Sequence, residues 1–447
     1  MIRVAIIGSG PAGAYAAEAL VRRGDVAVDV FDKSPCPFGL VRYGVAPDHD
    51  KIRSISAALS SMLDQPQVRF LGNVDVGTDI SVAELQQFYD AVLFASGAAT
   101  DRRLDVPGED LPGSFSSNEF VAWYNGHPDA PLDTFTLDAR SVAVVGMGNV
   151  AVDLGRLLAK TADELRHTDM GDRALAVLER SQVTDIHVIG RRGPAQAKFT
   201  TKELRELGEL ANADVFVDAA DLVLDEASEQ LLATRPAARR NVKILRDWAA
   251  RLPSGRPRRL HLRFWLRPVE VLGTDRVTGL RVEETRLDEA GDVVGTGRTC
   301  TIDAQKVLRA AGYRGVPIAG LPFDGRVGVV PNAAGRVVRD GEPLTGLYVA
   351  GWIKRGPTGV IGTNKSDARE TVTSLIEDAQ SLLPAPNRNP DDVLRLLAER
   401  DVRVVSWAGW EAIDRAECQL GQQRGNARVR ISERQELLRA ASGAPTR

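Results

Sequence analysis

Short apolar runs followed at once by glycine-rich turns recur along the chain. Val4–Ile7 and Ser141–Val145 are two such runs, and Pro11–Arg22 and Val150–Leu158 are the helical stretches that follow their turns. A short apolar run bounded by turn residues is typical of a buried strand. Strands that alternate with helices favour a parallel sheet. The pattern therefore predicts an α/β fold with two Rossmann-like units.

The first glycine-rich turn predicts a dinucleotide site. Gly8, Gly10 and Gly13 have the spacing that lets a backbone turn tightly, approach a pyrophosphate and pack a helix on a strand. The following strand ends at Asp32, about 20 residues after Gly13, where a carboxylate can accept hydrogen bonds from a ribose 2′-hydroxyl. An acid there favours FAD or NAD. The alternative is a surface acid at a strand end.

The second turn, Gly146–Ala151, predicts a site of different specificity. The strand that should carry its ribose contact is Asp185–Gly190, and it ends in Arg191 and Arg192. Two guanidinium groups at that place suit a 2′-phosphate, because arginine pairs with phosphate in a bidentate manner and stays charged. This turn therefore predicts NADPH binding. A solvated basic pair in a loop is the simpler interpretation.

Composition and charge limit the classes of protein to which the chain can belong. The 447 residues are 43% hydrophobic, which is enough for two or three domains, and the net charge of −3 gives no global attraction to nucleic acid. The three cysteines, Cys36, Cys300 and Cys418, form neither a CxxC pair nor a metal cluster, so we expect free thiols, no bound metal and no disulfide reductase. The chain has no long apolar run, and its first strand starts close to Met1. These features predict a cytoplasmic protein without membrane insertion.

Further along the chain, the sequence predicts a helical stretch, three strands and a C-terminal helical segment. Asp225–Arg251 is largely helical, with a break expected at Pro236. We expect strands at 260–266, 278–285 and 297–308, and a helical segment from about residue 385 after a proline-rich linker. The second half of the helical stretch is basic, with Arg235, Arg239, Arg240, Lys243, Arg246 and Arg251.

Several longer motifs resemble one known family. They include GLVRYGVAPDH at 39–49, GNVAVD at 148–153, VIGRRG at 188–193, the stretch from Thr200 to Glu206 and GWIKRGPTGVI at 351–361. In this order and at this length they are similar to the adrenodoxin reductase family. The resemblance implies a glutathione-reductase-like architecture, in which an NADPH domain (109–323) interrupts an FAD domain (1–108 and 324–447).

The resemblance also implies binding residues. For FAD they are Ala12, Asp32, Leu40, Val76, Trp352, Gly359, Val360 and Ile361, and for NADP they are Met147, Gly148, Asn149, Val150, Arg191, Arg192 and Glu203. Many family members have Glu where this chain has Asp32, so the ribose contact can differ. The amides of Val360 and Ile361 are expected at a helix N-terminus that faces the flavin.

His49 and Glu206 are implied near the nicotinamide, where they would orient the ring. Both positions have simpler interpretations. His49 is equally suited to a hydrogen-bonded turn, and Thr200 with Glu203 has the pattern of a capping box.

The activity that the resemblance implies is electron transfer from NADPH through FAD to a ferredoxin. The chain has no cysteine set for a cluster of its own, so the acceptor is a separate molecule. The basic stretch 235–251, together with Arg205, is a candidate docking surface for an acidic ferredoxin. A flavin monooxygenase, a quinone reductase and a non-catalytic redox sensor are the alternatives, and the oligomeric state stays open.

Overall fold

The computed structural model describes residues 1–444 and divides into two compact units. The first unit contains Met1–Thr100, Asn125–Asp129 and the chain from Tyr313 onward, and the second contains Asp101–Tyr124 and Ala130–Gly312. The second unit is thus an insertion in the first. The binding of FAD by one and NADPH by the other stays a prediction at this point.

The boundaries between the units differ from the expected residues 108 and 323. In the second unit Leu104 and Val106 pack against its hydrophobic core, and the Val271 N–H donates to the Pro107 carbonyl at 2.9 Å. In the first unit Ile318, Leu321 and Phe323 pack against the core that contains β4. Each crossover segment therefore joins the unit whose core buries its apolar side chains.

The first unit is built on a seven-stranded sheet with the order β16-β17-β18-β4-β1-β2-β3. The central strands β18, β4, β1, β2 and β3 are parallel, and β16 and β17 form an antiparallel edge. The bounds are β1 Ile2–Ile7, β2 Val26–Asp32, β3 Val68–Gly72, β4 Ala91–Phe94, β16 Asn332–Ala333, β17 Arg336–Arg339 and β18 Glu342–Val349. Short β5 (Thr100–Asp101) and β15 (Tyr313–Arg314) lie outside this sheet.

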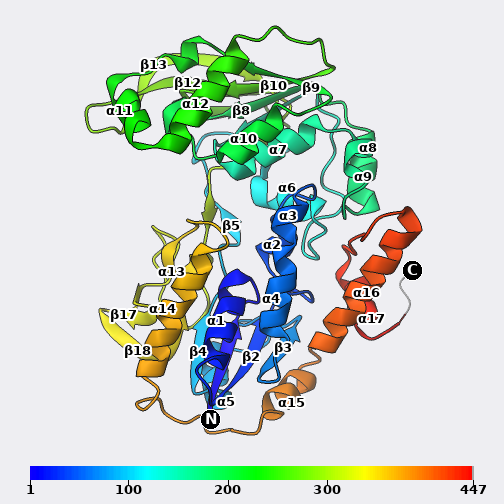
Figure 1. Cartoon of the computed structure of the whole chain (residues 1–447), viewed down its shortest axis with the longest axis vertical. Coiled ribbons are helices and arrows are strands. Elements are labelled where there is room, and N and C mark those ends of the chain that lie inside the picture. The colour runs from blue at the N-terminus through cyan, green and yellow to red at the C-terminus, as the bar shows by residue number, and fades with distance from the viewer. Residues whose placement is uncertain (445–447) are drawn as a thin grey trace. The chain divides into compact units, whose positions relative to one another are not determined.

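Helices cover both faces of this sheet (Figure 1). Helix α1 packs between α14 and α4 on one face. Apolar side chains of alternating strand positions fill two cores, one on each side of the sheet. Before the C-terminal segment, the helices of the unit are α1 Pro11–Val21, α2 Leu40–Tyr43, α3 Asp50–Arg53, α4 Ile55–Leu63, α5 Val82–Phe88, α13 Trp352–Arg355 and α14 Thr363–Glu377.

The second unit has a six-stranded parallel sheet and a separate three-stranded antiparallel sheet. The parallel order is β6-β14-β7-β8-β10-β9, and the antiparallel order is β11-β12-β13. The strands are β6 Ser114–Ser116, β7 Ser141–Val145, β8 Asp185–Ile189, β9 Ala213–Val217, β10 Arg258–Arg263, β11 Leu266–Leu272, β12 Gly279–Leu287, β13 Val293–Asp303 and β14 Lys306–Arg309.

The helices of this unit follow most of the expected pattern. Pro236 ends one helix and occupies the first turn of the next, as predicted. The helices are α6 Ser117–Tyr124, α7 Asn149–Ala159, α8 Ala162–Leu165, α9 Asp172–Glu179, α10 Thr201–Leu207, α11 Glu226–Thr234 and α12 Pro236–Ala249. Within residues 1–444 no helix has the length and apolarity to cross a bilayer.

Two expected strands prove to be four. The expected strand 260–266 ends at Arg263, because Trp265 adopts a left-handed φ of 57° and redirects the chain into β11 of the other sheet. The expected strand 297–308 is likewise divided between β13 and β14, which belong to different sheets. Each break occurs where the chain leaves one sheet and enters another. The periodicity of apolar residues does not indicate which sheet a strand joins.

The C-terminal segment is helical, as expected, and belongs to the first unit. Its helices are α15 Asp392–Glu399, α16 Trp407–Arg424 and α17 Arg434–Ala441. Trp410, Ile413 and Leu437 are buried in the same core as α1, and Gly72 at the end of β3 forms a bridge with Val405. The segment is thus part of the hydrophobic core.

A buried carboxylate on α16 links this helix to α2. Glu417 is fully buried, and its oxygens accept from the Arg42 Nη2 at 2.5 Å, the Arg428 Nη1 at 2.9 Å and the Ile431 N–H at 3.0 Å. Burial alone would raise the pKa of Glu417, but the neighbouring Arg42 and Arg428 guanidinium groups hold it below its usual value. Arg42 also lies over the Trp410 ring, at 5.2 Å from its centroid.

We expect Glu417→Gln to destabilise the first unit strongly. Removing one partner of a buried ion pair leaves uncompensated charge in the core, which costs about 3–5 kcal/mol. Glu377→Gln, which removes a carboxylate from an exposed pair with Arg336, should change stability by less than about 1 kcal/mol. Urea denaturation of both variants measures the difference, and equal midpoints would contradict the role assigned to Glu417.

Candidate dinucleotide sites

Each glycine of the first turn meets a different steric demand. Gly8 has a φ of 110°, and a Cβ there would lie 2.5 Å from the Ala95 carbonyl oxygen. A Cβ on Gly13 would lie 1.9 Å from the Gly8 carbonyl oxygen, where α1 crosses β1. A Cβ on Gly10 would meet nothing closer than the Gly39 Cα, at 3.9 Å. The outer two glycines are therefore needed for packing, while Gly10 leaves its backbone open to a ligand.

The start of α1 offers unsatisfied donors beside this opening. Gly10 is the N-cap and supplies no side-chain hydrogen bond, and Pro11 occupies the first turn. Ala12 and Gly13 follow within that turn and are buried. Free N–H groups at a helix start, with the helix dipole behind them, bind phosphate groups. The arrangement fits the pyrophosphate of FAD.

Asp32 holds the turn from the end of β2. Its Oδ2 accepts from the Ser9 N–H at 2.9 Å and from the Ser9 hydroxyl at 2.5 Å, and its Oδ1 accepts from the Ser34 N–H at 2.8 Å. Burial raises the pKa of Asp32, and these hydrogen bonds oppose that rise. The side chain is thus a built-in part of the turn, and its contact with a ribose stays a prediction. Our sequence interpretation missed Ser9, although its place between two turn glycines was a usable signal.

The remaining residues predicted for FAD lie in the first unit. Leu40 begins α2 and is exposed, and Val76 is partly buried near the end of β3. The Trp352 indole N–H donates to the Thr358 carbonyl at 3.2 Å, which closes the loop directly before Gly359. Gly359 has a φ of 83°.

The expectation for Val360 and Ile361 was wrong in one respect. Helix α14 begins at Thr363, so both residues precede the helix and do not form its first turn. The Val360 N–H donates to the Thr363 hydroxyl at 3.1 Å, because the chain makes a tight turn before the helix begins. Val360 itself is 70% exposed.

In the second turn, as in the first, one glycine is needed for close packing and another leaves its backbone open. Gly146 has a φ of 154°, and a Cβ there would lie 2.3 Å from the Ala310 carbonyl oxygen. A Cβ on Gly148 would meet no atom within 4 Å. Gly148 caps α7 without a side-chain bond, and Ala151 takes the third position in a buried place. This turn therefore fits a second pyrophosphate.

The neighbours of this turn are held by hydrogen bonds from one segment. The Lys198 N–H donates to the Met147 carbonyl at 2.9 Å, and the Thr200 N–H donates to the Asn149 Oδ1 at 2.8 Å. Val150, in the first turn of α7, is partly buried. Met147 and Asn149 are therefore positioned by residues 198–200, which lie beyond β8.

Arg191 and Arg192 follow β8 without a counter-charge. Within residues 1–444 neither guanidinium lies in an ion pair, and Arg191 is exposed. The Arg192 Nε is buried and has no hydrogen-bond partner among the described residues. Unneutralised guanidinium groups at the carboxyl end of a Rossmann strand fit a 2′-phosphate.

Glu203 and Glu206 lie one turn apart on α10. The Thr200 hydroxyl accepts from the Glu203 N–H at 3.3 Å, but Thr200 gives its own N–H to Asn149, so the expected capping box is only half formed. Burial, together with the nearby Asp153 and Glu206, raises the pKa of Glu203 to about 8. Glu206 lies 3.7 Å from Lys202 and from Arg156.

His49 belongs to the first unit and lies in a turn. Its N–H donates to the Ala46 carbonyl at 3.1 Å, and its own carbonyl accepts from the Ile52 N–H at 3.0 Å. The simpler interpretation of His49 as a turn residue therefore describes its backbone. A role near a nicotinamide stays a prediction for both His49 and Glu206.

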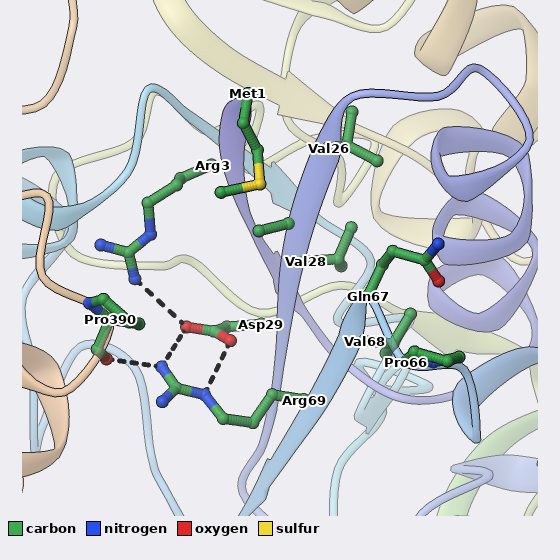
Figure 2. Close-up of a pocket in the computed structure, with 11 residues that line it drawn as sticks. Met1, Arg3, Val26, Val28, Asp29, Pro66, Gln67, Val68, Arg69 and Pro390 are labelled. Carbon is green, nitrogen blue, oxygen red and sulfur yellow. Dashed lines mark hydrogen bonds and ion pairs between the residues drawn. The ribbon is translucent and has the colours of Figure 1, made fainter.

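A cavity of about 310 Å³ lies elsewhere in the first unit (Figure 2). It is at the amino ends of β1, β2 and β3, whereas Gly8 and Asp32 are at the carboxyl ends. Asp29 pairs there with Arg69 at 2.6 Å and with Arg3 at 3.6 Å, and Arg69 also donates to the Pro390 carbonyl at 2.8 Å. Because ligands of parallel sheets bind at the carboxyl ends of strands, this cavity is not a dinucleotide site.

Two glycine-rich turns of this geometry, one in each unit, define the class of two-dinucleotide oxidoreductases. A family model described as pyridine nucleotide-disulphide oxidoreductase matches residues 2–190. The three cysteines are free thiols, of which Cys36 is buried, Cys418 partly buried and Cys300 exposed.

Comparison with known proteins identifies the family within this class of oxidoreductases. The chain is 43% identical to the NADPH-ferredoxin reductase FprA of Mycobacterium leprae, with 98% of each chain covered. It is 39% identical to the mitochondrial NADPH:adrenodoxin oxidoreductase of Arabidopsis thaliana, over 99% of this chain and 95% of that one. A structure of Mycobacterium tuberculosis FprA in complex with NADPH matches with a TM-score of 0.92 and 42% identity, covering 99% of this chain and all of that one. The chain belongs to the adrenodoxin reductase family, whose cofactors are FAD and NADPH.

The raised pKa of Glu203 predicts a pH-dependent stability. Between its ordinary pKa near 4.5 and a folded value of about 8, the folded protein binds more protons at this site than the unfolded chain does. Stability from this group is therefore lost as pH rises through that window, with a slope of at most about 1.4 kcal/mol per pH unit. Glu203→Gln should flatten the decline in thermal midpoint between pH 5 and 8. The exposed Glu209→Gln serves as control, and identical profiles for wild type and Glu203→Gln would contradict the assignment.

Proposed function

We propose that this protein is an NADPH-ferredoxin reductase, with FAD in the first unit and NADPH in the second. The observation that carries the proposal is the pair of turns at Gly10 and Gly148, where each glycine has open space beside it at the start of a helix. The next strand ends in an acid in the first unit and is followed by two arginines in the second. Asp32 suits an unphosphorylated ribose, and Arg191 with Arg192 suits a 2′-phosphate. The family relatives support the same assignment.

The chain's own residues would bind and orient the cofactors. Bound FAD supplies the chemistry, because a flavin accepts a two-electron hydride from NADPH and releases electrons singly to an iron–sulfur acceptor. The helix starts after Gly10 and Gly148 would hold the two pyrophosphates. Arg191 and Arg192 would hold the 2′-phosphate of NADPH.

Glu203, Glu206 and His49 are proposed to orient the nicotinamide. Hydride transfer to a flavin requires no general base, so a positioning role is sufficient for these side chains. The raised pKa of Glu203 supports this role, because perturbed titratable groups gather at functional sites. A protonated Glu203 could donate a hydrogen bond to a neutral partner such as a carboxamide oxygen.

The outer face of α12 is proposed as the ferredoxin docking surface. Arg239, Arg240, Lys243 and Arg246 are exposed on it, while Val242 and Leu245 face the core. Lys243 pairs with Asp247 at 3.0 Å, but within residues 1–444 Arg239 and Arg240 have no carboxylate in ion-pair distance. Arg246 lies 4.0 Å from Glu229, so Arg239 and Arg240 carry the charge on this face that is not neutralised, and such charge favours fast association with an acidic partner.

A stopped-flow experiment tests the proposed function. The flavin of the anaerobic protein should bleach rapidly with NADPH and slowly with NADH, and a ferredoxin from the same organism should then be reduced at a rate that falls with salt. Bleaching without electron transfer to a ferredoxin would favour a monooxygenase or quinone reductase. Cofactor binding without rapid bleaching would favour a redox sensor.

The phosphate-binding role of Arg192 gives a selective prediction. Arg192→Ala should raise the KM for NADPH by about tenfold or more, because a charge-assisted bond to phosphate is worth about 1.5–3 kcal/mol. The KM for NADH should change little. Steady-state reduction of a dye measures both values, and equal effects on both nucleotides would remove the phosphate-binding role.

The docking role of α12 predicts a salt-dependent defect. Arg239→Glu combined with Arg240→Glu should lower kcat/KM for ferredoxin by at least threefold at low salt, and the defect should shrink as salt rises. Flavin reduction by NADPH should keep its wild-type rate. Arg180→Glu, an exposed change in the same unit, is the control, and an equal loss in both variants would mean that net charge alone is responsible.

A further inference from the structure

Residues 198–201 connect the NADPH-binding turn to the basic helix. Lys198 and Thr200 donate their N–H groups to Met147 and Asn149, as described above. On the other side, the Thr201 hydroxyl donates to the Asn241 Oδ1 at 2.7 Å, and the Asn241 Nδ2 donates to the Phe199 carbonyl at 3.2 Å. One short segment is therefore hydrogen-bonded both to the turn and to α12.

Asn241 is built into the inner face of α12. It is 3% exposed and lies beside Val242, Leu245 and Trp248, which are all buried. Both ends of its amide are satisfied by the same segment. A buried polar side chain that is fully hydrogen-bonded fixes its partners in one geometry, because any displacement leaves an unsatisfied group in the core.

The turn needs such external support. Gly148 has no Cβ and faces open space, so side chains do not hold it from the ligand side. The Met147 carbonyl and the Asn149 side chain are both bound by residues 198–200. The position of the amides that face the pyrophosphate therefore depends on where this segment lies.

We propose that Asn241 is a positioning residue for NADPH, which acts through Phe199–Thr201 on the turn that contains Gly148. The proposal deepens the proposed function and rests on it. It also means that a single helix presents a basic outer face to the electron acceptor and an inner amide to the nucleotide segment.

Conservative changes of Thr201 provide the test, because valine replaces only the hydroxyl and serine removes only the methyl group. Thr201→Val removes the bond to Asn241, and Thr201→Ser keeps it. In the FAD-loaded protein, the Kd for NADP+ should rise between about three- and tenfold in Thr201→Val and stay near the wild-type value in Thr201→Ser, since one buried hydrogen bond is lost. Asn241→Ala should raise the Kd for NADP+ at least as much as Thr201→Val does. In the double variant the Kd should rise by less than the product of the two single-variant factors.

Thr184→Val is the matched control. It removes a hydroxyl that lies 2.9 Å from the Asp185 carboxylate and 3.2 Å from the Arg140 carbonyl, at the other end of the same sheet. It should leave the Kd unchanged even if the thermal midpoint falls. Should Asn241→Ala fail to fold, the comparison of Thr201→Val with Thr201→Ser carries the test without it.

The results distinguish failure of the proposed function from failure of the positioning role of Asn241. Failure of the wild-type protein to bind NADP+ would overturn the proposed function itself. A wild-type protein that binds NADP+, with the same Kd in Thr201→Val and Asn241→Ala, would overturn only the positioning role. A lower thermal midpoint with an unchanged Kd would likewise show that Asn241 serves the fold alone.

Discussion

The contact on which both sites depend is the close approach of a strand-end backbone to a neighbouring carbonyl. Gly8 lies against Ala95, and Gly146 lies against Ala310, so that a single added carbon would collide with each carbonyl. This approach lets the chain turn sharply from strand to helix and points the free N–H groups of the helix start outward. The open glycines, Gly10 and Gly148, are useful only because the first glycine of each turn is so tightly packed.

The two turns share their geometry but differ in electrostatics. At the first turn, the carboxylate of Asp32 accepts hydrogen bonds from Ser9 and Ser34, so the acid at the end of β2 is fixed to the turn. At the second turn, Arg191 and Arg192 carry positive charge that no carboxylate within residues 1–444 neutralises. An acid fixed to one turn and a basic pair without a counter-charge beyond the other are the physical difference on which the proposed discrimination between two dinucleotides rests.

Much of this arrangement was predictable, because it is encoded locally. The strand, turn and helix around Gly8 and Gly146 and the helix break at Pro236 follow from periodicity and backbone chemistry. The break at Trp265 and the start of α14 after Val360 were not predictable, since they depend on which sheet a strand joins and on how a turn closes. Asn241 was missed for a related reason: its partners lie some 40 residues away in sequence, and an asparagine within a basic helix carries no local signal.

The ion pair between Arg42 and Glu417 has a consequence for how the chain is made. The two residues are 375 positions apart, so nearly the whole protein must leave the ribosome before the guanidinium meets its carboxylate. Strand β18, which pairs with β4 near the middle of the first sheet, likewise follows the entire inserted unit. The second unit, continuous apart from one short excursion, can fold as it emerges, whereas the sheet of the first unit stays incomplete, and Arg42 stays without its carboxylate, until the later segments follow. Synthesis from the N-terminus to the C-terminus therefore allows the inserted unit to be completed first. A truncation before α16 removes Glu417 and leaves Arg42 without its buried carboxylate partner.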